Sequence, residues 1–272
     1  KSCLLLSGLY AAGPTAIKEP VLSRDHTERM MLSLGVPLQT AGSMVFLDPN
    51  GDWDHGWDGF EWHVPGDPSS AAFPAIAALL VPGSEVTVEG VCVNPTRTGL
   101  FDLMRIMGAG VEAIPKGEGA GGEPVADLIV RHASARGVVA GGELIVRMID
   151  EVPVLCALAA VAKGTTEIRD AEELRVKESD RIAVMADVLR AFGVPCDELP
   201  DGMVIEGGAP LHAAEVTSHG DHRIAMTAAL LGLVAEGETV VNDVGCVETS
   251  FPGFASLMRG LGAPIEEEEQ GS

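Results

Sequence analysis

The hydrophobic positions of this chain follow a pattern that occurs four times. Each copy has an Ala/Leu-rich apolar run, a short β-branched segment, a polar loop and a second, amphipathic run. The first runs end at Gly13, Gly83, Gly164 and Gly237, and the second runs end at Gly35, Gly108, Gly193 and Gly262. Glycine is the usual left-handed stop of a helix, so both runs of each copy are predicted to be helices. A spacing of about 70 to 80 residues predicts repeated α/β units rather than solenoid turns.

The strand predictions come from short segments of alternating or β-branched apolar residues. They cover 15–18, 85–89, 165–169 and 238–243 after the first helices, and 43–48, 127–132 and 202–206 elsewhere. The pattern predicts sheets and buried helices in each unit, with the helices inside and the strands outside or the reverse.

A domain boundary is predicted near residue 64. Residues 48–64 are rich in Asp, Gly and Trp, and the turn-forming sequence VPGDPSS follows at 64–70. This cluster also supplies an N-cap for the apolar helix over 73–80. We therefore expect one domain to end at residue 64 and the next to begin at residue 65.

Composition and charge narrow the possible partners. With 272 residues, 46% of them hydrophobic, the chain can bury a sizeable core, and its formal charge of −22 repels nucleic acid and anionic membrane surfaces. No apolar run reaches the roughly 18 to 20 residues of a membrane span. The five cysteines lie far apart without a CxxC pair, which favours buried thiols and a cytoplasmic location over disulfides or a zinc site.

The most chemically suggestive stretch is LRVKESDR at 174–181. Lys177 and Arg181 are four residues apart, so we expect them to share a face at the start of a helix, where free backbone N–H groups also attract an anion. That arrangement would bind a phosphate or carboxylate. Ordinary capping, with Glu178 and Asp180 paired to the two cations, remains an equally open explanation of the spacing.

Two further charged clusters stand at equivalent places in other copies. The fourth copy has His222 and Arg223 before its helix, and the first copy has Ser23 and Arg24. Equivalent loops of a pseudosymmetric fold tend to meet at one cleft, which favours a site for a small anionic substrate. His219 and His222 lack a third ligand in register, so we expect no metal there.

Six segments taken together resemble the family of 5-enolpyruvylshikimate-3-phosphate synthases. They are KSCLLLSGL (1–9), SRDHTE (23–28), VPGDPSSA (64–71), LRVKESDR (174–181), GDHRIAM (220–226) and TSFP (249–252). The resemblance implies an α/β fold of two domains, each with three βαβαββ units around a pseudo-threefold axis and with the active site between them. Residues 1–64 would be the last unit of the N-terminal domain, and residues 65–272 the three units of the C-terminal domain.

The resemblance also implies an activity. The enzyme would be a transferase of the shikimate pathway, the route to the aromatic amino acids and the target of glyphosate. It would transfer the enolpyruvyl group of phosphoenolpyruvate to the 5-hydroxyl of shikimate 3-phosphate and release phosphate, without a metal or an organic cofactor.

Site residues are carried over by position in the matching segments. Asp150 would take the 5-hydroxyl proton, Lys177 would handle protons at the enol carbon, and Glu178 would be a neighbouring acid or base. Arg181 and Arg223 would clamp phosphoenolpyruvate with their planar guanidinium forks, with His222 beside them. Ser23 and Arg24 would hold the phosphate of shikimate 3-phosphate.

Two departures from the family pattern affect the prediction. Many members have a lysine where this chain has Thr249. The family's N-terminal substrate residues would all precede Lys1, and the chain starts inside an apolar helix pattern. We therefore expect a fragment that is inactive alone and needs a complementing N-terminal chain. The alternatives are the sister enolpyruvyl transferase that acts on UDP-N-acetylglucosamine, and a non-catalytic complementing half.

Overall fold

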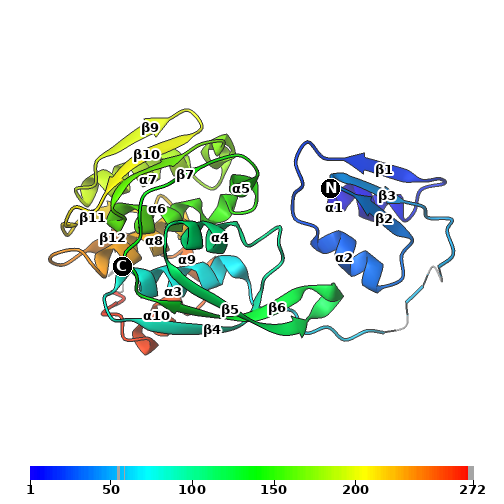
Figure 1. The fold of residues 1–272 in the computed structure, drawn as a ribbon, viewed down its shortest axis with the longest axis horizontal. Helices are drawn as coiled ribbons and strands as arrows, with labels where there is room; N and C mark the ends of the chain where they lie inside the picture. Colours follow the sequence, from blue (N-terminus) through cyan, green and yellow to red (C-terminus); the bar gives the residue numbers. More distant parts are fainter. Residues whose placement is uncertain (54–55, 58, 269–272) are drawn as a thin grey trace.

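The computed structural model describes residues 1–53, 56–57 and 59–268. A small unit at one end of the molecule is joined to a larger body in which helices are covered by sheets (Figure 1). The small unit contains α1 (Ser2–Gly8), β1 (Thr15–Lys18), α2 (His26–Ser33), β2 (Leu38–Ala41) and β3 (Met44–Leu47). Its strands form an antiparallel sheet in the order β1-β3-β2.

The larger body repeats this plan twice in full and a third time in part. The second unit comprises α3 (Pro68–Leu80), β4 (Glu85–Cys92), α4 (Gly99–Ile106), β5 (Gly110–Glu118), the 3-10 turn η1 (Ala120–Gly122) and β6 (Pro124–Arg131). Its strand order, β4-β6-β5, is the order of the first unit. The same alternation of helix and strand therefore folds in the same way in both copies.

The third unit adds a strand before its first helix. It contains β7 (Val139–Ala140), α5 (Glu143–Val146), η2 (Ile149–Glu151), α6 (Val152–Val161), β8 (Gly164–Ile168), η3 (Glu172–Val176), α7 (Arg181–Ala191), β9 (Cys196–Leu199) and β10 (Gly202–Gly207). Strand β7 pairs in parallel with β8, and the order continues as β10-β9. This is a βαβαββ arrangement.

The fourth unit begins in the same way. It contains β11 (Glu215–Thr217), α8 (His222–Gly232), β12 (Val240–Asn242), α9 (Val247–Ser250) and α10 (Phe254–Gly260). Strands β11 and β12 are parallel, as β7 and β8 are. The parallel pair requires a crossover, which α8 supplies.

Three helices form the centre of the larger body. Nearly every residue of α3 and α6 is buried, and α8 buries most of its length. These helices pack against one another, with the sheets outside them (Figure 1). Of the two arrangements that the sequence allowed, the structure has the helices inside.

The predicted helix ends agree with the structure at six of the eight glycines. Gly35, Gly83, Gly108, Gly164, Gly193 and Gly262 all have positive φ within three residues of a helix end. Gly237 also has positive φ, but α8 ends five residues earlier, at Gly232, and α1 likewise ends five residues before Gly13, at Gly8. There a Cβ would come within 2.9 Å of Leu47 and Thr15, so a glycine is needed for close packing rather than for a left-handed turn.

The small unit contacts the larger body through a polar cluster that we call the Asn94 junction, formed by Asp25, His26, Asn94 and Glu123. Asn94 is fully buried and its Nδ2 donates to Asp25 Oδ1 at 2.6 Å and to Glu123 Oε2 at 2.8 Å. The other Glu123 oxygen lies 2.6 Å from His26 Nδ1. Each side has its own apolar core, so this junction sets the position of one core relative to the other.

Candidate active site

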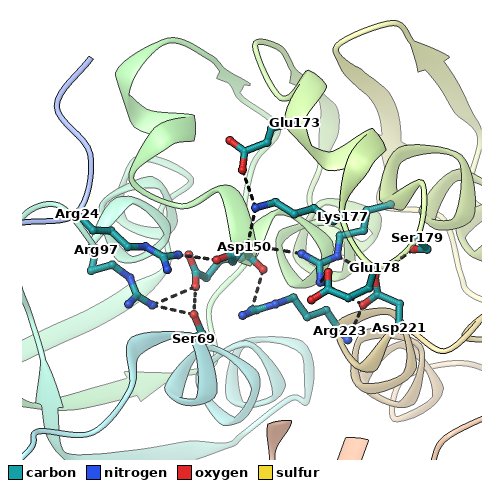
Figure 2. Close-up of polar contacts among 12 residues, drawn as sticks. Arg24, Ser69, Arg97, Asp150, Glu173, Lys177, Glu178, Ser179, Asp221 and Arg223 are labelled. Carbon is teal, nitrogen blue, oxygen red and sulfur yellow. Dashed lines mark hydrogen bonds and ion pairs between the residues drawn. The ribbon is translucent and has the colours of Figure 1, made fainter. Parts of the chain in front are cut away.

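Asp150 lies where charged side chains from three units meet. It is part of η2, the single turn before the buried helix α6. Its carboxylate lies 2.5 Å from Arg24 NH2, 3.6 Å from Lys177 Nζ and 3.5 Å from Arg181 NH1. Figure 2 shows Arg24, Lys177 and Arg223 directed at Asp150 from different sides. The structure therefore brings together residues that are up to 199 positions apart, Arg24 and Arg223.

These cations control the ionisation of Asp150. Burial would raise the pKa of its carboxyl, but Arg223, Arg24 and Lys177 oppose that effect and lower the pKa to about 2. The side chain is 17% exposed, so it remains accessible to a small molecule. Asp150 is thus an ionised carboxylate held by neighbouring cations.

Arg223 approaches the same place from the first turn of α8. Its NH1 donates to the backbone oxygen of Asp150 at 2.9 Å. Burial lowers the pKa of Arg223 and also that of the adjacent His222, which favours a neutral imidazole beside a charged guanidinium. Both residues line a small pocket whose opposite wall includes Ser250 and Phe251.

Each nitrogen of the Arg181 guanidinium contacts a carboxylate. The side chain is 1% exposed, and its Nε donates to Asp221 Oδ2 at 2.8 Å while NH2 lies 3.3 Å from Asp221 Oδ1 and 2.5 Å from Glu178 Oε2. Only NH1 faces Asp150. The two-nitrogen fork of Arg181, which we expected to bind phosphoenolpyruvate, therefore contacts Asp221. The reason is that α7 and α8 begin side by side and bury both charges between them.

Asp221 was not among the site residues predicted from the sequence. It caps α8, accepting from the backbone N–H of Arg223 at 3.0 Å, but it also accepts from Ser179 Oγ at 3.0 Å and pairs with Arg181. An acidic residue directly before the His-Arg pair was the only signal in the sequence. That signal did not identify Arg181, 40 residues earlier in the chain, as the partner of Asp221.

The prediction that Lys177 and Arg181 share a helix face is wrong. Helix α7 begins at Arg181, and Lys177 lies in the extended connection after η3. The two cations nevertheless converge on Asp150, and Lys177 Nζ also pairs with Glu173 at 2.7 Å. Asp180 caps α7 through Ala183 N, so the local sequence stops the helix before it could include Lys177.

The alternative capping explanation is half correct. Glu178 does pair with Arg181, three residues away. Asp180 pairs with Arg175 at 2.8 Å instead of Lys177. The local pairs and the long-range convergence therefore coexist.

Ser23 and Arg24 lie in the loop between β1 and α2. Ser23 Oγ donates to Glu19 Oε1 at 2.5 Å, and Glu19 in turn pairs with Lys1 at 2.8 Å. Arg24 is 41% exposed and extends from the small unit to Asp150 in the larger body. The first copy of the repeat thus contributes to the same cluster as the third and fourth copies.

The segment at Thr249 contributes no cation to this cluster. Thr249 lies in α9, where its hydroxyl donates to the backbone oxygen of Cys246 at 2.6 Å. Over the described part of the chain, no three His, Cys, Asp or Glu side chains are arranged to hold a metal ion. The arrangement around Asp150 suits acid–base and anion-binding chemistry.

Comparisons with known proteins all indicate the same enzyme family. Residues 1–258 match the family described as EPSP synthase (3-phosphoshikimate 1-carboxyvinyltransferase). A 3-phosphoshikimate 1-carboxyvinyltransferase of Geobacter sulfurreducens is 52% identical over 260 residues, which are 95% of this chain and 59% of the relative. Another from Desulforudis audaxviator is 48% identical over 96% of this chain and 60% of its own length.

Solved structures give the same result for the backbone. An EPSP synthase from Acinetobacter baumannii superposes with a TM-score of 0.89 at 40% identity, covering 97% of this chain and 60% of that protein. The enolpyruvyl transferase NikO from Streptomyces tendae gives a TM-score of 0.72 at 20% identity, over 96% of this chain and 58% of that protein. The chain spans about 60% of the length of the relatives it matches.

Proposed function

Because this chain belongs to the EPSP synthase family, we propose that it forms the larger part of an enzyme that transfers the enolpyruvyl group of phosphoenolpyruvate to shikimate 3-phosphate. The chain has the enolpyruvyl transferase fold. The proposal concerns its reaction, its substrates and the roles of its residues.

The observation that carries the proposal is the ionised Asp150 carboxylate at the centre of four cationic side chains. In a chain with a formal charge of −22, such a local concentration of positive charge is suited to anionic substrates. Both proposed substrates carry phosphate, and phosphoenolpyruvate also carries a carboxylate. A guanidinium or ammonium group can bind either anion.

The reaction needs a proton acceptor and a proton donor. Asp150 would accept the proton of the 5-hydroxyl while the hydroxyl oxygen forms a bond to C2 of phosphoenolpyruvate. Lys177 would deliver a proton to C3. The resulting tetrahedral intermediate then loses a proton from C3 and inorganic phosphate from C2, which restores the double bond. Glu178 is a neighbouring acid or base candidate for these proton transfers.

Substrate anions would replace contacts that the cations make with Asp150. We assign Arg223, with His222 beside it, and NH1 of Arg181 to phosphoenolpyruvate, and Ser23 and Arg24 to the shikimate phosphate. Arg24 is the most exposed of these arginines and can leave Asp150 for a phosphate most readily. Its departure would expose the carboxylate to the 5-hydroxyl.

The proposed enzyme includes a complementing N-terminal segment, in the same or another polypeptide. Helix α1 takes the place in its unit that α3 holds in the second unit, yet Leu4 is 57% and Leu6 is 53% exposed, whereas α3 is buried against α6 and α8. We propose that residues 1–64 are the last unit of an N-terminal domain whose other units cover α1, and that 65–272 form the C-terminal domain. Alone, the chain would be inactive.

The proposed setting is the cytoplasm. All five cysteines are free thiols, as a reducing compartment would leave them. No helix in the described part of the chain has both the length and the apolar character to cross a bilayer.

Reconstitution tests this function directly. The chain is combined with a segment equivalent to the unmatched part of its relatives, and phosphate release is measured with phosphoenolpyruvate plus shikimate 3-phosphate. We expect turnover only in the combined sample, and a loss of about 10²-fold or more in kcat for Asp150→Ala.

UDP-N-acetylglucosamine in place of shikimate 3-phosphate is the control substrate. Turnover with the UDP-sugar alone would overturn the proposal. A folded complex that is inactive with both acceptors would leave the chain as a binding partner only.

A further inference from the structure

A second polar cluster lies beside η2, around the carboxyl of Glu151. We call it the Ser69 network, formed by Asp67, Ser69, Arg97 and Glu151. Ser69 Oγ donates to Glu151 Oε1, and Arg97 NH2 donates to Ser69 Oγ at 2.8 Å and to Asp67 Oδ1 at 3.2 Å. The network connects the first turn of α3 to η2, and so the second unit to the third (Figure 2 shows Ser69 and Arg97).

The network is unusually deep for charged groups. Glu151 is 2% exposed, Ser69 is 5% and Arg97 is 8%. Glu151 Oε2 and Arg97 Nε are buried and have no hydrogen-bond partner among the described residues. Burial raises the pKa of Glu151, against the opposing effect of Arg97 and Arg223. A hydrophobic residue at this place would avoid the desolvation penalty, so stability alone does not account for a buried carboxyl.

Glu151 is covalently adjacent to Asp150, and the two side chains have opposite surroundings. One is held among the cations, and the other is anchored in the Ser69 network. η2 is a single turn with no side-chain cap, so it has little rigidity of its own. Besides the cations that contact Asp150, Ser69 and Arg97 contact this turn through Glu151, Arg97 with its NH2 3.8 Å from Glu151 Oε1.

We propose that Glu151 is a positioning residue: bound by Ser69 and Arg97, it fixes η2 so that the Asp150 carboxylate stays among Lys177, Arg181 and Arg223. This inference rests on the proposed function for its catalytic consequence, but the placement of Asp150 can be measured without turnover. It also gives a role to the Gly-Asp-Pro-Ser-Ser sequence at 66–70, which otherwise serves only as a helix start.

The first test uses this chain alone. Ser69→Ala removes the donor to Glu151, and Ser70→Ala is a matched control because the Ser70 hydroxyl donates to Asp67 and, among the described residues, not to η2. Carboxyl ¹³C NMR, assigned with Asp150→Asn, follows the ionisation of Asp150. In Ser69→Ala we expect its half-titration point to rise from about 2 toward the ordinary value near 4, while Ser70→Ala leaves it unchanged.

Equal Asp150 titration in the two serine variants would overturn the proposal. If Ser69→Ala fails to fold, Glu151→Gln takes its place, since glutamine keeps an oxygen for the Ser69 hydroxyl. The positioning role then requires Asp150 to titrate as in the unmodified chain. A shift of the Asp150 pKa in either direction would overturn it, and a lowered pKa would show that Glu151 acts on Asp150 through charge repulsion and not through anchoring.

The second test uses the reconstituted enzyme. A displacement of a catalytic group by about 1 Å can lower the rate about 10²-fold, so Glu151→Ala should lower kcat by about that factor. Both KM values should stay within about 3-fold of those of the unmodified enzyme. The acid limb of the kcat–pH profile should move to higher pH. Glu151→Gln should stay within about 10-fold. If Asp150→Ala is inactive but Glu151→Ala is not impaired, the positioning role fails alone. If Asp150→Ala is fully active, the role of Asp150 as the base fails, and the NMR result still decides the placement; absence of turnover in the unmodified reconstituted enzyme would be the failure of the proposed function.

Discussion

Replacing Asp221 by alanine should destabilise the larger core more than any exposed substitution in the same helices. Asp221 and Arg181 are 0% and 1% exposed, and the aspartate both pairs with the guanidinium and caps α8. Removing one partner of a buried pair costs about 3 to 5 kcal/mol, and losing an N-cap costs about 1 kcal/mol. Arg181 would keep Glu178 and a 3.5 Å contact with Asp150, so we expect about 4 kcal/mol, near the low end of the sum.

Urea unfolding of this chain at neutral pH, followed by far-UV circular dichroism, measures this loss. Tryptophan fluorescence is unsuitable because all three tryptophans lie between residues 53 and 62, outside the larger core. Asp187→Ala is the matched control, since it removes an α7 carboxylate that pairs with Arg190 at 80% exposure of the aspartate side chain. That change should stay within about 0.5 kcal/mol.

A double variant separates charge compensation from shape. Arg181→Met with Asp221→Leu removes both charges, so it should be more stable than Asp221→Ala, although the lost cap remains. A loss below about 1.5 kcal/mol for Asp221→Ala would mean that the cap alone matters, and the reasoning about the buried pair would be refuted.

Three other predictions concern the contacts between units and the charge on Asp150. Asn94→Ala leaves the carboxylates of Asp25 and Glu123 without their shared donor, so limited proteolysis between the two cores should become faster; an unchanged rate would contradict the role of the junction. Arg24→Ala removes the cation closest to the carboxylate of Asp150 and should raise the pKa of Asp150 above about 2 in a carboxyl NMR titration. Because the folded-state pKa of Asp150 is depressed, its contribution to stability is complete above about pH 4 and is lost as the pH falls toward about 2, and Asp150→Asn should flatten the urea-midpoint profile across that window.

Much of the fold could be predicted from the sequence because it depends on local patterns. Six of the eight glycine stops coincide with positive φ within three residues of a helix end, and β1 occupies the predicted residues 15–18. The exception at Gly13 is instructive, because the apolar run continued past Gly8 and periodicity cannot detect a tight contact with Leu47. Local composition reports backbone preference, and it does not report what lies opposite.

The candidate site shows the same difference between what local sequence predicts and what tertiary packing decides. Its residue types and positions were predicted, but the geometry assumed for Lys177 and Arg181 was wrong, because Asp180 starts α7 one residue before Arg181. Which carboxylate each cation contacts depends on segments from other units, and the sequence shows no distance between them. Ser69 was singled out as part of a helix start, and its contact with Glu151 required the packing of α3 beside η2.

The sequence by itself thus determined the repeated α/β units, the helix ends, the acidic net charge and the family. The tertiary structure alone decided that Arg24, Lys177, Arg181 and Arg223 surround one carboxylate, and that the neighbouring Glu151 is buried against Ser69 and Arg97. The physical reason is that propensity and periodicity act over a few residues. Electrostatic fields and desolvation depend on distances between side chains that only the packing of separate units sets.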